Sequence, residues 1–205
     1  RHKSELNLLF SDKPANRQLV TMIKRRLYIL ECSFFLKLYK FARVYIKNSK
    51  IWINFPAKFN AYYKEVNGVS AQLSFTQEEM RKGQQELLRM GIKPVDQFIC
   101  FQSRDSAYLD KLSLGYPRQA WVYHDYRDSD IRNYLPAAEH FASLGISAVR
   151  VGYIVEYPIK SSNPRIIDYS THYRSDFMDI YLLGNCKFFL GNNSGLLCVA
   201  QAFDV

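Results

Sequence analysis

Residues 187–200 read Lys-Phe-Phe-Leu-Gly-Asn-Asn-Ser-Gly-Leu-Leu-Cys-Val-Ala. A short apolar run leads into Gly-Asn-Asn-Ser-Gly, and an apolar pattern with helical spacing follows at once. This order is typical of a buried parallel strand, a tight turn and a helix. The start of such a helix has unpaired backbone N–H groups and about half a positive charge, which favour a bound phosphate or carboxylate. Asn193 and Ser194 can cap the helix or face a ligand, and Gly195 would let a ligand approach the backbone closely.

The ninety residues before this stretch predict further strands and helices. Apolar runs at 97–101, 147–152 and 165–168 have the length of strands. Pro136 and Ser175 each open an apolar pattern with helical spacing. From residue 97 the predicted order is strand, loop, helix, strand, strand, helix, strand, helix. This order indicates an α/β fold, a Rossmann-like C-terminal domain with a mostly parallel sheet.

The first half of the chain differs in charge and pattern. Residues 1–95 contain 18 Lys or Arg against 7 Asp or Glu, whereas residues 96–205 contain 10 against 12. Apolar positions from Leu19 to Leu30 recur at helical spacing among basic residues, and Thr76-Gln77-Glu78-Glu79 is a capping box that opens another helix. The excess of basic side chains indicates either a solvated face or an anionic partner such as lipid, nucleic acid or acidic glycan.

These changes predict two domains. Residues 1–94 would form part of a basic, helix-rich N-terminal domain, and residues 95–205 a Rossmann-like domain. Residue 1 is not methionine, and residue 205 closes a helix-like run. We therefore expect the first domain to be partial and the second to be truncated at its C-terminus.

Polar residues follow the strand predicted at 97–101 and fill the long connection after it. Arg104 comes directly after that strand, where a guanidinium can bind a diphosphate or pair with Asp105 or another carboxylate. His124, Asp125 and Asp128 lie in the connection and can act as a general base, orient a hydroxyl or simply be solvated. The connection at 107–130 is long for a compact domain, which favours a functional loop.

Several well-known motifs do not occur in this sequence. It contains no Gly-x-Gly-x-x-Gly, no P-loop Gly-Lys-Ser/Thr and no His-Glu-x-x-His, which argues against dinucleotide reduction, P-loop ATP hydrolysis and zinc proteolysis. Asp176 opens a predicted helix, where a carboxylate can bind a sugar hydroxyl or stabilise the helix N-terminus.

A resemblance to a known family rests on three segments. They are Phe-Ile-Cys-Phe-Gln-Ser-Arg-Asp-Ser-Ala-Tyr-Leu at 98–109, Tyr-His-Asp-Tyr-Arg-Asp-Ser-Asp-Ile at 123–131, and Ser-Asp-Phe-Met-Asp-Ile-Tyr-Leu-Leu-Gly-Asn-Cys-Lys-Phe-Phe-Leu-Gly-Asn-Asn-Ser-Gly-Leu at 175–196. Together they resemble a bacterial family of glycosyltransferases that is more distantly similar to fucosyltransferases, including the peptide O-fucosyltransferases.

The resemblance implies a GT-B architecture, in which two Rossmann-like domains face across a cleft and the C-terminal one binds a nucleotide-sugar donor. In the fucosyltransferase-like group a His-x-Arg motif follows the first strand of that domain, and its arginine binds the donor diphosphate. Here the arginine matches Arg104, whereas Gln102 occupies the histidine position, which puts a catalytic role for that position in doubt. Ser194 and Gly195 match the Ser-Gly pair through which the family binds donor phosphate. The resemblance also implies a metal-independent enzyme without a cofactor.

The sequence therefore predicts a glycosyltransferase of surface-polysaccharide or glycoconjugate synthesis, which moves a sugar from a nucleotide-sugar to a hydroxyl acceptor. We expect it in the cytoplasm, with peripheral contact to an anionic membrane left open and with no nucleic-acid partner. The expected catalytic residues are Asp125, Asp105 and His124, and the expected donor-binding residues are Arg104, Asn193, Ser194, Gly195 and Asp176. Two alternatives stay open: a non-catalytic module whose basic half docks on anionic lipid or nucleic acid, and a sugar-nucleotide epimerase of GT-B-like fold.

Overall fold

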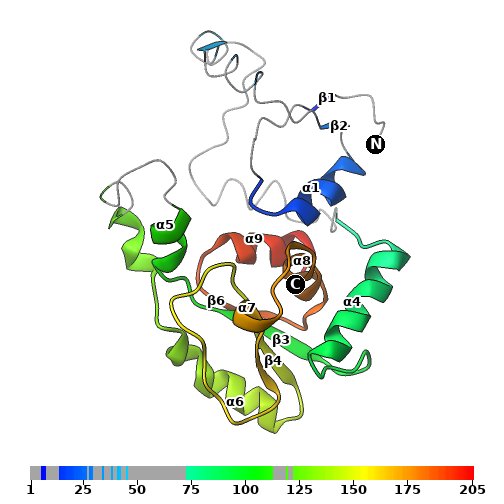
Figure 1. Cartoon of the computed structure of the whole chain (residues 1–205), viewed down its shortest axis with the longest axis vertical. Helices are drawn as coiled ribbons and strands as arrows, with labels where there is room; N and C mark the ends of the chain where they lie inside the picture. Colours follow the sequence, from blue (N-terminus) through cyan, green and yellow to red (C-terminus); the bar gives the residue numbers. More distant parts are fainter. Residues whose placement is uncertain are drawn as a thin grey trace. The chain divides into compact units, whose positions relative to one another are not determined.

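The structure is a computed structural model of residues 1–205, and it describes residues 6–7, 14–26, 28–29, 34, 38, 41–42, 45, 73–112, 119 and 122–205. Contacts divide the chain into two units, Arg1–Leu73 and Ser74–Val205 (Figure 1). The two units are considered separately below.

In the first unit, the structure gives the bounds of helix α1 and of a pair of short strands. Strand β1 (Leu6–Asn7) pairs in parallel with β2 (Tyr28–Ile29), and α1 (Arg17–Lys24) lies between them in the chain. Asn16 caps α1, because its Oδ1 accepts a hydrogen bond from the backbone N–H of Leu19 at 3.1 Å. The predicted amphipathic helix is therefore present but shorter than expected, since the chain has left it before β2.

The second unit is built on a four-stranded sheet in which every pair of neighbours is parallel. Its strands are β3 (Phe98–Gln102), β4 (Ser147–Arg150), β5 (Ile166–Asp168) and β6 (Phe189–Gly191), and their order across the sheet is β5-β4-β3-β6 (Figure 1). The chain moves from β3 outward to β5 and then crosses to the other side of β3. This confirms the predicted α/β fold and is compatible with a Rossmann-like domain. The reversal of direction lies between β3 and β6, which is where ligands bind in open α/β sheets.

The helices of this unit cover both faces of the sheet. They are α4 (Gln77–Arg89), α5 (Ala107–Leu112), the 3₁₀ helices η2 (Val122–Arg127) and η3 (Ile131–Tyr134), α6 (Leu135–Ser143), α7 (Tyr169–His172), α8 (Asp176–Asn185) and α9 (Gly195–Ala202). On one face, Ile99 and Phe101 of β3 pack in a buried cluster with Ala138 and Ala142 of α6. All five residues of β3 are buried, as expected for a parallel strand covered on both faces.

Helix α4 belongs to the second unit. It begins with the predicted capping box, in which Thr76 Oγ1 accepts from the backbone N–H of Glu79 at 3.2 Å and the Thr76 N–H donates to Glu79 Oε2 at 2.8 Å. The helix packs on α8, and a Cβ added to Gly83 would lie 2.0 Å from the ring of Tyr181. The boundary between the contact units therefore falls before α4, whereas the boundary expected near Pro94 falls after it.

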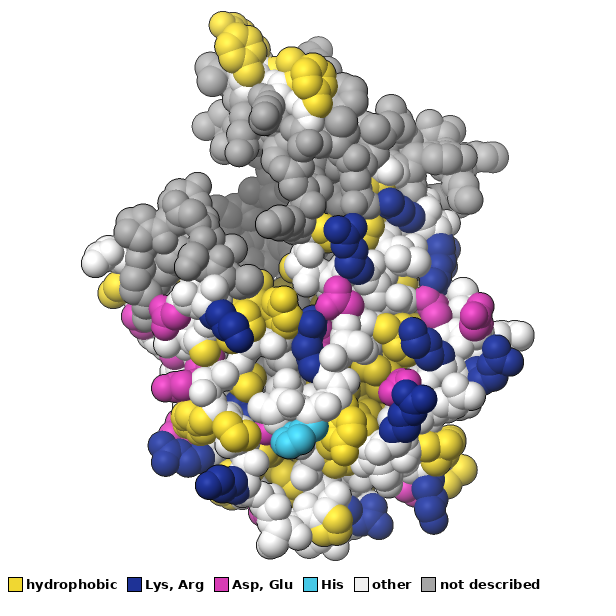
Figure 2. All heavy atoms as spheres, in the orientation of Figure 1, with side chains coloured by type: hydrophobic (Ala, Val, Ile, Leu, Met, Phe, Trp, Pro, Cys, Tyr) yellow, Lys and Arg dark blue, Asp and Glu magenta, His cyan; other side chains and the backbone are white. Residues whose placement is uncertain are grey.

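The described surface mixes the two signs of charge. On the face shown in Figure 2, Lys and Arg side chains lie among Asp and Glu side chains. Within the part of the chain that the structure describes, no helix combines the length and the apolar character needed to cross a bilayer.

Candidate functional site

Two turns meet at the carboxyl ends of β3 and β6. Gln102, the last residue of β3, is in register with Gly191, the last residue of β6. The strands approach closely at this point, because a Cβ added to Gly191 would lie 2.7 Å from the backbone oxygen of Gln102. The turn that begins at Ser103 and the turn at 192–194 therefore leave the sheet side by side, at its change of direction.

The side chain of Asn192 holds these turns together. Its Oδ1 accepts a hydrogen bond from the backbone N–H of Arg104 at 2.8 Å. Its Nδ2 donates to Ser129 Oγ at 3.1 Å and also to the backbone oxygen of Arg127. The Ser129 N–H in turn donates to the backbone oxygen of Arg104 at 2.9 Å. Asn192 thus joins three segments. Its neighbour Asn193, which the sequence predicted as a donor-binding residue, is exposed.

The guanidinium of Arg104 forms an ion pair with Asp128. Both side chains are largely withdrawn from solvent, with exposed fractions of 14% for Arg104 and 22% for Asp128. Asp105, the other carboxylate considered as a partner, is held elsewhere: its two oxygens accept from the backbone N–H groups of Ala107 and Glu156, each at 3.1 Å. Of the two possibilities raised for Arg104, the structure shows the internal ion pair.

The start of α9 is open. Ser194 is its N-cap residue, but the hydroxyl makes no capping bond and donates instead to Gln102 Oε1 at 2.8 Å. Gly195 is exposed, and a Cβ added there would meet no atom of the described residues within 4 Å. Within the part of the chain that the structure describes, the start of α9 is therefore uncovered at Gly195 and has no side-chain cap from Ser194, which leaves its N–H groups open to an anion.

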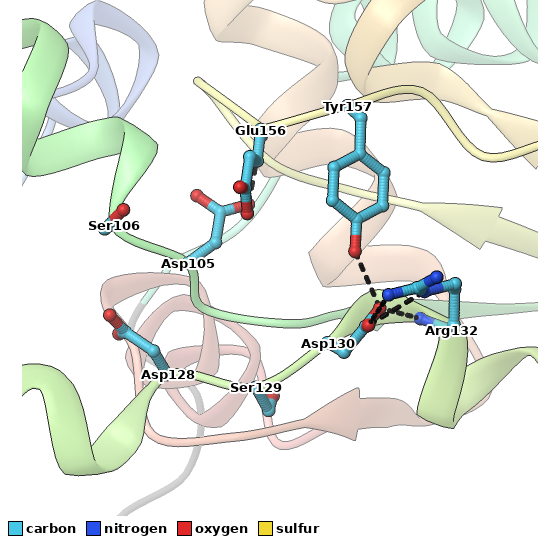
Figure 3. A pocket seen from close by; sticks show the side chains of 8 residues that line it. All are labelled: Asp105, Ser106, Asp128, Ser129, Asp130, Arg132, Glu156 and Tyr157. Atoms are coloured by element: carbon cyan, nitrogen blue, oxygen red, sulfur yellow. Dashed lines mark hydrogen bonds and ion pairs between the residues drawn. The ribbon is translucent and has the colours of Figure 1, made fainter.

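A cavity lies beside these turns. It is open to solvent and has a volume of about 400 Å³ (Figure 3). Its lining comes from the turn after β3, from the segment between η2 and η3, from η3, and from the connection between β4 and β5. The lining residues are Asp105, Ser106, Asp128, Ser129, Asp130, Arg132, Glu156 and Tyr157.

Asp130 is the most heavily bonded carboxylate of this cavity. Its Oδ2 accepts from Arg132 Nε at 2.8 Å, and its Oδ1 accepts from the Tyr157 hydroxyl at 2.7 Å. The hydrogen bond from Arg132 is the main reason that the pKa of Asp130 lies well below its usual range. The same carboxylate raises the pKa of Tyr157, because the hydroxyl donates to it. Asp130 is thus an ionised acceptor at neutral pH.

The remaining predicted catalytic residues, His124 and Asp125, lie in η2. The backbone oxygen of Asp125 accepts from the Asp128 N–H at 2.8 Å, and Asp125 does not line the cavity. The side chain of His124 lies outside the described residues. Of the three, the structure places only Asp105 in the cavity.

Asp176 belongs to a different cluster at the start of α8. It pairs with Arg174 at 2.6 Å, and Arg174 also pairs with buried Asp179 at 2.8 Å. The guanidinium lies 3.9 Å from the ring centre of Tyr153. The Tyr169 hydroxyl donates to Asp179 at 2.7 Å, and burial raises the pKa of both groups. The position of Asp176 agrees with a charge that stabilises the helix N-terminus, and it does not line the cavity.

Of the residues that line this cavity, the sequence indicated Asp105 and Asp128 but not Asp130, Arg132, Glu156 and Tyr157. Asp128-Ser129-Asp130 is an Asp-x-Asp sequence, a pattern that can hold a metal ion. In the structure its two carboxylates pair with two different arginines, Arg104 and Arg132. Among the described residues, no three His, Cys, Asp or Glu side chains are gathered as a metal site requires. The absence of metal from the mechanism stays a prediction.

Comparison of the chain with family models, curated proteins and solved structures found no match. The fold and the contacts described above are therefore what bears on function, and the resemblance to glycosyltransferases stays a prediction.

Proposed function

We propose that the second unit binds the diphosphate of a nucleotide-sugar between the turns after β3 and β6, and that the protein is a glycosyltransferase. One observation carries this proposal: the turn with Arg104 and the open start of α9 adjoin at the change of direction in a parallel sheet. A helix N-terminus and a guanidinium are both suited to a diphosphate, and they would stabilise the charge that develops on this leaving group.

Binding in this way requires Arg104 to exchange partners. Its guanidinium is bound to Asp128, and a diphosphate would have to displace that carboxylate. The backbone of the turn would stay in place during the exchange, because Asn192 holds it through a separate hydrogen bond to the Arg104 N–H. The backbone of the proposed site is therefore held in place without a ligand, while the charge of Arg104 is paired with Asp128.

Asp105 is the carboxylate best placed to deprotonate an acceptor hydroxyl. It lines the cavity one residue after Arg104, and two backbone N–H groups fix its orientation. Asp125 and His124 remain candidates for this role, and Ser194 and Gly195 remain candidates for the phosphate. A GT-B partner domain built from the basic first unit, a cytoplasmic location and contact with an anionic membrane surface belong to the same proposal.

The test is calorimetric titration of the full chain with GDP-, UDP- and CDP-sugars. Binding of one donor should weaken by about 1.5–3 kcal/mol in Arg104→Ala, the usual contribution of a hydrogen bond to a charged group. Arg89→Ala is the matched control, because this arginine is 73% exposed and pairs with Glu86 on α4, away from the cavity. Unchanged donor affinity in Arg104→Ala would contradict the proposal. Analysis of the products would separate transfer to an acceptor from epimerisation of the donor.

Docking of the basic first half on lipid or nucleic acid stays a prediction. Much of the excess charge comes from residues outside the described ones, so the structure does not favour this alternative.

A further inference from the structure

The cavity beside the proposed diphosphate site has a negative lining. Among the described residues that line it, four are carboxylates: Asp105, Asp128, Asp130 and Glu156. Arg132 is the cation among the described lining residues, and Arg104 pairs with Asp128 from outside them. A phosphate in this cavity would be repelled by the carboxylates. Two like charges 4 Å apart repel by about 1 kcal/mol in water and by several kcal/mol in a partly buried site.

The carboxylates are held as hydrogen-bond acceptors. The two oxygens of Asp105 each accept one backbone N–H, so each keeps a further lone pair for a ligand. Arg132 and Tyr157 orient Asp130 from the opposite side of the cavity (Figure 3). Ser106 adds a hydroxyl, which can donate or accept. Acceptors fixed on two sides of one cavity suit a molecule with several hydroxyl groups.

The cavity is joined to the proposed diphosphate site by hydrogen bonds. Ser129 lines the cavity, and its Oγ accepts from Asn192, whose Oδ1 accepts from the Arg104 N–H. Asp128, the partner of Arg104, also lines the cavity, so a group attached to a diphosphate at Arg104 would lie next to the cavity. The volume of about 400 Å³ lies within the range of about 300–1,000 Å³ that is usual for ligand pockets.

We propose that this cavity receives the sugar of the donor, and that it selects an uncharged, hydroxyl-rich sugar against one that bears a carboxylate. The inference rests on the proposed function, since it names the class of sugar that the same site takes. It assigns the recognition of sugar hydroxyls to Asp105 and Asp130, and the rejection of acidic sugars mainly to Glu156, whose exposed side chain stands at the cavity.

The test compares donors that differ only at one carbon of the sugar. The full chain is titrated with UDP-glucose and UDP-glucuronic acid, with GDP-mannose and GDP-mannuronic acid, and with UDP and GDP alone. The neutral member of the pair whose nucleotide binds should bind about tenfold more tightly than its acidic counterpart, as expected for one unfavourable charge contact.

Two variants assign the effect to the cavity. Glu156→Gln should reduce the preference for the neutral sugar about threefold, because it removes one repelling charge and leaves the backbone N–H that holds Asp105. Glu78→Gln makes the same change on the exposed first turn of α4 and should leave the preference unchanged.

The outcomes are distinguishable. If UDP or GDP binds but the neutral and acidic sugars bind equally, the inference is wrong while the proposed diphosphate site stands. Equal loss of preference in both variants would also overturn it, because the selection would then come from overall charge. If none of the UDP-, GDP- and CDP-sugars binds, the proposed function fails and the inference fails with it.

Discussion

Replacing Asp128 with Asn should strengthen the binding of inorganic pyrophosphate to this chain. In the structure the Asp128 carboxylate occupies the guanidinium of Arg104, which the proposed function requires for the diphosphate. A ligand must therefore break this ion pair before it can use the arginine. Asparagine has nearly the same shape but no charge, so it competes less strongly for the guanidinium.

The size of the effect follows from the burial of the pair. With exposed fractions of 14% and 22%, it lies between an exposed ion pair, worth about 0–1 kcal/mol, and a hydrogen bond to a charged group, worth about 1.5–3 kcal/mol. We take about 1–2 kcal/mol, which corresponds to binding that is about 5–30-fold tighter. The free energy of unfolding should fall by no more than the same amount.

Isothermal titration of pyrophosphate into the folded variants measures this directly. Asp130→Asn is the control, because it removes an equal charge from the same cavity while its partner is Arg132. It should change the affinity less than Asp128→Asn does. The double variant Arg104→Ala, Asp128→Asn should show none of the gain.

A folded Asp128→Asn variant that binds pyrophosphate no better than the parent chain would refute the reasoning. The ion pair would then be purely structural, and Arg104 would not be available to a ligand. A gain that persists without Arg104 would refute it equally, since the charge effect would be general.

Three further predictions concern the framework of the site. Gly191→Ala should lower the free energy of unfolding by about 1–3 kcal/mol, because its Cβ would lie 2.7 Å from the Gln102 backbone oxygen. Gly195→Ala meets open space and should change it by less than about 0.5 kcal/mol, so equal effects in urea denaturation would contradict the close approach of β3 and β6. Thr76→Ala should cost about 0.5–2 kcal/mol through loss of the capping box, and an unchanged denaturation midpoint would contradict that role. Asp130→Asn should lose less thermal stability than the parent between pH 5 and pH 3. Arg132 holds the pKa of the Asp130 carboxyl below its usual range. The stabilisation that the ionised carboxylate gives the fold is therefore present above about pH 4 and is lost as the pH falls further. Melting temperatures that fall equally in the parent and the variant between pH 5 and pH 3 would contradict this.

The elements of the second unit could be predicted because their signals are local. The apolar run at 97–101 corresponds to β3, and the stretch at 187–200 contains β6 and most of α9. Ser175 caps α8 as predicted, through a bond from the Met178 N–H to its Oγ at 3.2 Å. In each case a few neighbouring residues decide the structure, so no knowledge of distant contacts is needed.

The side chains that build the site could be predicted only in part. The sequence located the turn at 192–194 but favoured Asn193, whereas the side chain that reaches the turn after β3 is that of Asn192. Which of two adjacent side chains points inward depends on the register between β3 and β6. No periodic pattern records a register between strands almost ninety residues apart.

The cavity depends on contacts between residues of different loops. Arg104 pairs with Asp128, and Asp105 accepts from the Glu156 N–H, which lies 51 positions away in the chain. Tyr157 reaches Asp130 from the same connection between β4 and β5. Loop residues of this kind show no spacing that reveals their partners, although Asp128-Ser129-Asp130 was a visible sign that carboxylates gather here.

The central claim is that the turn after β3 and the start of α9 bind one diphosphate together. The most direct measurement is a titration of the ¹⁵N-labelled full chain with pyrophosphate, followed through the backbone amide signals. We predict that the signals of Arg104 and Gly195 shift together with a single dissociation constant. Shifts at only one of the two, or with different dissociation constants, would contradict the claim.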